Sequence, residues 1–118
     1  NSFTVIEHIT RGLMGIEVDA AQNMVSTFSR LENENDRAEL KNVPVMGTTI
    51  SVKHKGHSET TLTNHGNTTI IWNVQMKKGA LVFQVNGKKT QSFFSEKGNF
   101  SFTSLEVPAG KTITVSAN

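Results

Sequence analysis

Cysteine and tyrosine are both absent from the 118-residue chain. Without cysteine the protein has no disulfide scaffold, no thiolate metal site and no cysteine nucleophile, although this absence alone does not assign a compartment. Apolar residues never form a run of the roughly 20 residues that cross a bilayer as a helix. A chain of this length is typical of a single domain, here 1–118, which is large enough to bury a core.

Catalytic signatures are also missing. The sequence contains no GxSxG, HExxH, P-loop or GxGxxG motif. Asp19 and Asp36 are the aspartates, and after residue 45 the carboxylates are Glu59, Glu96 and Glu106. Neither a Ser-His-Asp triad nor a pair of glycosidase carboxylates has local support. We therefore predict that the protein is not an enzyme and needs no cofactor.

The first part of the chain, residues 1–45, has apolar residues in steps of three and four from Phe3 to Leu31. This spacing is typical of an amphipathic helix. Asp19 and Gln22 resemble a capping box, and Pro44 would stop the helix. The pattern predicts a helix over residues 20–41.

Residues 2–16 leave two alternatives, because β-branched side chains and two glycines weaken a helix there. Either one helix runs from about residue 3 to 41, or a strand or short helix precedes the helix over 20–41. The continuous apolar period favours the long or interrupted helix.

The second part, residues 46–118, has glycines at regular intervals with β-branched and aromatic runs between them. This pattern is typical of an antiparallel sandwich or barrel. Asn86-Gly87 favours a two-residue hairpin turn. The strands are predicted near 48–54, 57–63, 68–76, 80–85, 88–95, 99–105 and 111–117. The predicted fold class is α+β: a mainly helical segment over 1–45 followed by an antiparallel seven-stranded β-sandwich with an immunoglobulin-like layout.

Charge is unevenly distributed. Residues 1–50 hold four basic and seven acidic residues (−3), whereas residues 51–118 hold eight lysines and three glutamates (+5). Such lysines commonly form a solvated surface that protects sheet edges; alternatively they bind an anionic ligand or a neighbouring subunit. The candidate binding patch is Lys77, Lys78, Lys88 and Lys89. Because these cations are lysine and not arginine, nucleic-acid binding is disfavoured.

Three histidines form a candidate metal site. If Lys55-Gly56 is a two-residue turn, His54 and His57 are cross-strand neighbours that can share a metal ion. His65 would supply a third ligand, with Glu59 nearby, and three protein ligands are common at catalytic zinc. The alternative is that histidines near tight turns are exposed and bind nothing.

The sequence pattern predicts that most of the aromatic residues lie in the core. Trp72 lies on the apolar face of a strand, and Phe83, Phe100 and Phe102 alternate as core residues do. Phe93 and Phe94 are adjacent and must point to opposite faces of a sheet. Either the N-terminal helix covers the outward ring or the ring lines a ligand groove, and the first alternative is favoured.

Two sequons place asparagines where glycans attach, at Asn67 and Asn99. They favour an extracellular or cell-surface location. The chain begins at Asn1 without a methionine, so we expect a processed or truncated start, with any targeting segment upstream.

The helical stripe from Phe3 to Leu31 followed by glycine-punctuated strands resembles the soluble part of type IV pilin-like proteins. The resemblance is one of layout, without a specific motif, and it implies a filament subunit that self-associates and has an upstream membrane anchor. We predict a non-enzymatic structural or adhesion protein outside the cytoplasm. The alternative is a secreted β-sandwich module that binds a glycan or a protein through its loops. A metal-dependent enzyme is a third and weaker alternative.

Overall fold

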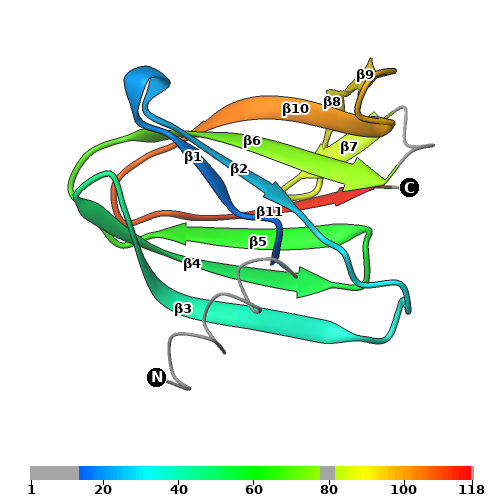
Figure 1. The fold of residues 1–118 in the computed structure, drawn as a ribbon, viewed down its shortest axis with the longest axis horizontal. Coiled ribbons are helices and arrows are strands. Elements are labelled where there is room, and N and C mark those ends of the chain that lie inside the picture. Colours follow the sequence, from blue (N-terminus) through cyan, green and yellow to red (C-terminus); the bar gives the residue numbers. More distant parts are fainter. Residues whose placement is uncertain (1–13, 78–81, 118) are drawn as a thin grey trace.

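The computed structural model describes residues 14–77 and 82–117, which fold into two packed β-sheets (Figure 1). The five-stranded sheet has the order β1-β2-β6-β10-β9, and the six-stranded sheet has the order β3-β4-β5-β11-β7-β8. The first sheet is made of β1 (Glu17–Asp19), β2 (Met24–Phe28), β6 (Ile70–Lys77), β9 (Phe93–Ser95) and β10 (Phe100–Val107). The second is made of β3 (Arg37–Val45), β4 (Thr48–Lys55), β5 (Glu59–Asn64), β7 (Val82–Val85), β8 (Lys88–Gln91) and β11 (Thr112–Ala117).

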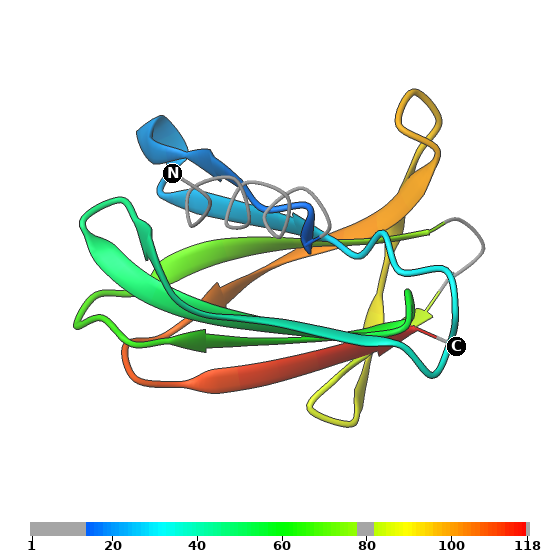
Figure 2. The same cartoon turned by 60° about the horizontal axis from the view of Figure 1, so that its bottom comes forward.

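Two features of the connectivity shape the sandwich. Strands β2 and β6 pair in parallel, with Met24 beside Ile71, whereas the other described strand pairs are antiparallel. Strands β8 and β9 follow one another in the chain but belong to different sheets, so the chain crosses between the layers at Ser92. Figure 2 shows this crossing at one side of the molecule.

The core lies between the sheets and is centred on Trp72, whose side chain is fully buried. Its indole Nε1–H donates a hydrogen bond of 2.8 Å to the hydroxyl oxygen of Thr27 in β2. Pairing this buried donor avoids a desolvation penalty of about 1–3 kcal/mol. The largest apolar side chains packed with it are Met14, Ile50, Leu62, Ile70, Met76 and Phe83.

The predicted strands of the second part are confirmed. All seven predicted segments contain strands, and the segment 88–95 divides into β8 and β9 at Ser92. The predicted hairpin turn is also present, because Asn86 and Gly87 have φ values of 49° and 83°. Positive φ at both central residues is the geometry that matches the twist of a hairpin.

The predicted helix over residues 20–41 is wrong, and so are the α+β class and the seven-stranded sandwich, because the first part of the chain adds β1, β2 and β3 to the two sheets. This segment follows β1 and forms the three-residue 3-10 turn Ala20–Gln22, β2 and the start of β3. In β2 the buried positions are Val25 and Thr27, with Ser29 following. Two of these three residues are polar. The positions of the apolar residues alone therefore do not show the alternation that is typical of a strand.

Strand β3 contains a bulge. Its inward residues are Ala38, Leu40, Val43 and Val45, and the register shifts between Leu40 and Val43. Asn42, inside the bulge, has a φ of 58°. An extra residue in one strand turns steps of two into a step of three, which imitates helical spacing.

The predicted capping box of Asp19 and Gln22 is wrong, because Asp19 makes no side-chain hydrogen bond to a backbone N–H of the 3-10 turn. Gln22 Nε2 donates a 2.7 Å hydrogen bond to Asp19 Oδ2, but the two residues flank a 3-10 turn that leads into β2. Of the alternatives for residues 2–16, positions 2–13 lie outside the described residues. No helix among the described residues is long and apolar enough to cross a membrane.

Candidate functional site

The outer face of the five-stranded sheet carries a cluster of phenylalanine rings from three strands. Strand register places Phe28, Gln75, Phe102 and Phe93 in one row across β2, β6, β10 and β9. Phe100 lies two positions from Phe102 on the same face, because alternate residues of a strand point the same way. We call Phe28, Phe93, Phe100 and Phe102 the phenylalanine face.

The rings of this face contact one another. The centroid distances are 6.1 Å for Phe28 and Phe100, 5.9 Å for Phe100 and Phe102, and 5.9 Å for Phe93 and Phe102. The planes are tilted by 52°, 64° and 36°. Such tilted pairs add about 0.5–1.5 kcal/mol each beyond simple burial. The cluster is therefore preorganised.

Solvent reaches this face most at its β9 edge. Phe93 is 54% exposed, and the neighbouring Phe94, which points to the opposite side of β9, is 49% exposed. The prediction that Phe93 and Phe94 point to opposite faces is confirmed. No N-terminal helix over residues 20–41 exists to cover the outward ring.

Phe100 and Phe102 are not core residues, contrary to the sequence prediction. In the first half of β10 the inward positions are Ser101 and Thr103, which lie opposite Met76 and Val74 of β6. This half of the strand therefore turns its polar side chains toward the interior and its aromatic side chains outward, whereas Leu105 and Val107 of the second half pack in the core. Phe28 was missed altogether because it was assigned to a helix; the signal available was its aromatic side chain next to β-branched Thr27.

Cationic side chains surround the phenylalanine face. The guanidinium carbon of Arg30 lies 5.5 Å from the ring centroid of Phe28, within the range of a cation–π contact. Lys77 is the cross-strand partner of Phe100. Exposed Lys97 sits in the turn between β9 and β10, beside exposed Glu96.

The outer face of the six-stranded sheet is polar by contrast. The Thr61 and Thr114 hydroxyls lie 2.8 Å apart, and so do those of Thr63 and Thr112. A shallow hollow of about 210 Å³ on this face is bordered by Thr61, Thr63 and Thr112 together with Glu39 and Lys53. The two outer faces of the sandwich thus differ in chemistry.

His54 lies in the core and not at a surface site. Its Nε2 is 2.8 Å from the carbonyl oxygen of Met14, and its Nδ1 is 2.7 Å from the hydroxyl of Thr60. Because a carbonyl can only accept, Nε2 carries the proton and Nδ1 accepts from Thr60. Burial lowers the pKa of His54, and the hydrogen bond to Met14 opposes part of this effect.

His57 belongs to a turn and forms a small polar group. The predicted two-residue turn is wrong: Lys55 pairs with Glu59, so residues 56–58 form the connection and His54 faces Thr60. The Glu34 carboxylate lies 3.2 Å from His57 Nε2 and accepts a 3.1 Å hydrogen bond from Ser58.

This group is not arranged as a catalytic triad. In a triad the imidazole lies between the hydroxyl and the carboxylate and takes the proton of the hydroxyl. Here the carboxylate of Glu34 lies between His57 and Ser58. The contact instead holds the loop containing Glu34 against the β4–β5 turn, where a Cβ on Gly56 would lie 2.9 Å from Glu34 Cα.

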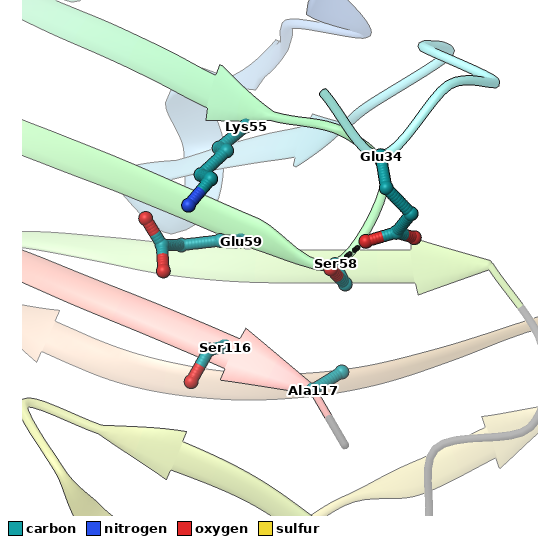
Figure 3. A pocket seen from close by; sticks show the side chains of 6 residues that line it. All are labelled: Glu34, Lys55, Ser58, Glu59, Ser116 and Ala117. Carbon is teal, nitrogen blue, oxygen red and sulfur yellow. Dashed lines mark hydrogen bonds between the residues drawn. The ribbon is translucent and has the colours of Figure 1, made fainter. Parts of the chain in front are cut away.

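A polar pocket of about 240 Å³ adjoins this turn (Figure 3). Its lining residues are Glu34, Lys55, Ser58, Glu59, Ser116 and Ala117. Figure 3 shows Lys55 and Glu59 on one side of the pocket and Glu34 with Ser58 on another. Opposite charges on its walls give it no clear preference for an anion or a cation.

The three-histidine metal site is not assembled. His54 is buried, His57 lies in the turn, and His65 is exposed, with its Nε2 2.7 Å from the hydroxyl of Ser51. Within residues 14–77 and 82–117, no group of three histidine, aspartate or glutamate side chains is placed to hold a metal ion. The longer β4–β5 turn separates the two histidines that a two-residue turn would have paired.

The other predicted site residues are dispersed. Lys77 ends β6 in the five-stranded sheet, whereas Lys88 and Lys89 begin β8 in the six-stranded sheet. Lys78 lies outside the described residues. The predicted lysine patch is therefore not gathered on one strand pair. The sequon asparagines, Asn67 and Asn99, are both exposed.

The sequence matches no protein-family model and no curated protein. Among solved structures, the chain is similar in fold to a GH127 β-L-arabinofuranosidase from Geobacillus stearothermophilus T6. That likeness has a TM-score of 0.53 and 9% identity over 88% of this chain and 16% of that one. A second GH127 β-arabinofuranosidase gives a TM-score of 0.45 and 14% identity over 82% of this chain and 18% of that one. The chain thus spans about one sixth of the length of these enzymes.

Proposed function

We propose that this chain is a non-catalytic β-sandwich module that docks onto another folded protein through the phenylalanine face. The observation that carries the proposal is a packed set of four aromatic rings that ends in Phe93, which is 54% exposed. Contiguous apolar patches on protein surfaces commonly mark interaction sites. Aromatic side chains at the centre of such patches supply most of the binding energy.

The ring geometry favours a protein partner over a sugar. Stacking against a sugar ring needs a flat aromatic surface, whereas these planes are tilted by 36–64°. An irregular apolar surface with gaps between the rings suits interdigitating side chains of a folded partner. Gln75, in the row between Phe28 and Phe102, offers an amide for a hydrogen bond within the patch.

The likeness to part of a longer chain supports a modular role. A sandwich of this fold makes up 16% of the GH127 enzyme from Geobacillus stearothermophilus T6, where it is accompanied by much more protein. In our proposal the phenylalanine face is the surface through which this chain joins such a larger assembly. The arabinofuranosidase activity of that enzyme forms no part of the proposal.

Of the two functions expected from the sequence, the binding module is retained. The filament subunit depended on an N-terminal helical stripe, and residues 17–45 form strands in its place. We retain the extracellular location as part of the proposal. Asn67 supports it better than Asn99, since Ser101 of the second sequon is buried. Expression in a glycosylating host, followed by intact-mass measurement, should show a glycan at Asn67.

The docking proposal is tested by site-specific crosslinking. A photo-crosslinking phenylalanine analogue replaces Phe93 in the chain expressed in its native host, and the same analogue at Thr61 on the polar face serves as control. We expect a defined protein adduct at position 93 and none at position 61. The adduct partner is identified by mass spectrometry and purified.

The affinity of the purified partner decides the proposal. Truncating a hot-spot aromatic side chain costs about 2 kcal/mol or more, so Phe93→Ala should weaken binding about 30-fold. Thr61→Ala should leave the affinity unchanged. Because Phe93 is half exposed, its truncation should preserve the fold, which circular dichroism verifies. Equal affinity of Phe93→Ala and the wild-type chain would refute the proposal.

A further inference from the structure

We infer that the protein which docks on the phenylalanine face is a second copy of this chain, turned end for end along the strands. This inference rests on the proposed docking function and names the partner for it. The observation that carries it is the division of charge between the two ends of the outer face of the five-stranded sheet.

One end of this outer face is acidic. The strand register forms one row across β1, β2, β6 and β10 from Asp19, Met24, Ile71 and Glu106. Glu17 lies two positions before Asp19, so its side chain leaves β1 on the same side. All three acidic residues are exposed. This end therefore presents three carboxylates beside the partly buried side chains of Met24 and Ile71.

The opposite end of the outer face carries lysines. Lys77 is the last residue of β6 and the cross-strand partner of Phe100. Lys97 lies with Glu96 in the turn between β9 and β10, and both are exposed. This turn packs on the Phe100 ring, because a Cβ on Gly98 would lie 2.0 Å from Phe100 Cε2. Lys97 is therefore at the same end of the sheet as Lys77.

The two ends cannot neutralise each other within one chain. Lys77 and Ile71, the partner of Glu106, are six residues apart along β6, which corresponds to about 20 Å. Among the residues that the structure describes, neither Lys77 nor Glu106 takes part in an ion pair. Both charges can therefore pair with a partner protein.

A second copy brings these opposite charges together if it is rotated by 180° about an axis that lies in the interface and runs across the strands. With the axis at the level of Val74, which is three residues from Lys77 and three from Ile71, Lys77 of one copy faces the row of Glu106 in the other. Strands β6 and β10 are neighbours about 4.8 Å apart, a gap that a lysine side chain spans. In a two-fold interface each contact occurs twice, so two such ion pairs form.

The charges also select this orientation over the other face-to-face arrangement. An axis that runs along the strands would place the acidic end of one copy on the acidic end of the other. Like charges juxtaposed across an interface oppose association. The end-for-end arrangement instead joins the three carboxylates of one copy to the lysine end of the other.

The centre of this arrangement is formed by rings and amides. Phe93 and Phe102 lie in the row one residue from the axis, so each comes within about 7 Å of its own counterpart along the strand direction. Asn73 of one copy lies against Gln75 of the other. In the part of the chain that the structure describes, Asn73 Oδ1 has no hydrogen-bond partner. Turning this amide toward the second copy therefore breaks no hydrogen bond of that oxygen.

The size of the outer face fits a weak dimer. Strands β6 and β10 contain eight residues each, and the other three strands of the sheet are shorter. With strands about 4.8 Å apart, the face covers on the order of 500 Å² per copy, which places the total at the lower end of specific interfaces. We therefore expect a dissociation constant in the micromolar range.

Charge reversal with complementation tests the inference on the purified chain. Sedimentation over a concentration series compares the wild-type chain, Lys77→Glu, Glu106→Lys and an equimolar mixture of these two variants. Each single variant places like charges at both ion-pair positions, so its dimer should be about tenfold weaker at low salt. In the mixture both positions again join opposite charges, so the mixed dimer should recover the wild-type affinity.

Matched controls separate this effect from a general response to charge. Glu39→Lys and Lys53→Glu reverse exposed residues of the six-stranded sheet and should leave the dimer unchanged. Phe93→Ala should weaken the dimer, because Phe93 lies beside the axis. A wild-type dimer that both Lys77→Glu and Glu106→Lys leave intact would overturn the inference, and so would a mixture that fails to recover.

Failure of the inference and failure of the docking proposal give different results. A photo-crosslinked adduct at position 93 with twice the mass of the chain would support both. A chain that stays monomeric over the whole series, with a different crosslinked protein whose affinity depends on Phe93, would overturn the second copy alone. A monomeric chain without any Phe93-dependent partner would overturn the docking proposal as well.

Discussion

The imidazole of His54 donates a 2.8 Å hydrogen bond to the backbone carbonyl of Met14, a residue 40 positions earlier in the chain. Both residues are fully buried, and Thr60 donates to the other ring nitrogen of His54. The contact ties the beginning of the described chain to β4 through a titratable group. Protonation would require the Thr60 hydroxyl to change from donor to acceptor and would place a charge in the core.

Stability should therefore fall in mildly acidic solution. The pKa of His54 is lowered in the folded state, whereas an unfolded histidine titrates near 6.5. As the pH drops below about 6.5 the unfolded chain gains a proton before the folded chain does, so the free energy of unfolding decreases. Above that pH the free energy of unfolding has its full value. Urea unfolding at several pH values between about 5 and 7.5 measures the slope.

A matched pair of variants isolates the contribution of His54. His54→Gln retains a donor but cannot titrate, and His65→Gln alters an exposed histidine. We expect a flatter pH dependence in His54→Gln and an unaltered slope in His65→Gln. The same slope in His54→Gln as in the wild-type chain would show that the buried imidazole is not the source.

Thr27→Val should destabilise the protein by about 1–3 kcal/mol, because it leaves the buried Nε1–H of Trp72 without its acceptor. Thr27→Ser keeps the hydroxyl and should cost less. Trp72 is the single tryptophan of the chain, so its fluorescence reports both unfolding and the polarity around the indole. A Thr27→Val chain as stable as Thr27→Ser would contradict this role for the hydrogen bond.

Gly15→Ala should be among the more damaging single-methyl changes. Gly15 has a φ of 63°, and a Cβ there would lie 2.1 Å from the carbonyl oxygen of Phe28. Gly87 also has a positive φ, of 83°, but nothing lies within 4 Å of its Cβ position. Gly87→Ala should cost about 1–2 kcal/mol for the backbone conformation alone, and Gly15→Ala more. Comparable thermal unfolding midpoints for the two variants would argue against this packing.

Zn²⁺ should leave the thermal unfolding midpoint unchanged. Both ring nitrogens of His54 are already hydrogen-bonded inside the core, and its metal coordination would require breaking those bonds. A thermal-shift titration with Zn²⁺ and Ni²⁺ checks this. A stoichiometric rise in the midpoint that His57→Ala removes would restore the metal hypothesis.

The second part of the chain could be predicted because its periodicity and its turn residues agree. Ile70, Trp72, Val74 and Met76 alternate without interruption and all face the core. Asn86-Gly87 tolerates the positive φ that the turn requires. The local preferences of the sequence and the packing of the whole fold therefore favour the same strands.

The first part could not be predicted because its strands depart from simple alternation. Thr27 and Ser29 fill core positions of β2 through hydrogen bonds to Trp72 and to the carbonyl oxygen of Gly56. Their partners lie 45 and 27 positions away, which no local pattern reveals. The bulge in β3 interrupts the alternation further, between Leu40 and Val43.

The candidate site was hidden by a reversal of the usual polarity. In β10 the aromatic residues Phe100 and Phe102 face outward, while Ser101 and Thr103 are buried. Alternation identifies two faces of a strand but not which of them is inside. The neighbouring residues in β6 decide it, and they come from a segment more than 20 positions earlier.

The parallel pairing of β2 and β6 imposes an order on folding. The chain between Met24 and Ile71 consists largely of the consecutive strands β3, β4 and β5. It must return to β2 before Met24 and Ile71 can pair. Neighbouring strands close short loops, whereas β2 and β6 close a long one at greater entropic cost. We expect the β3–β4–β5 meander to form early and the five-stranded sheet, with its phenylalanine face, to be completed late.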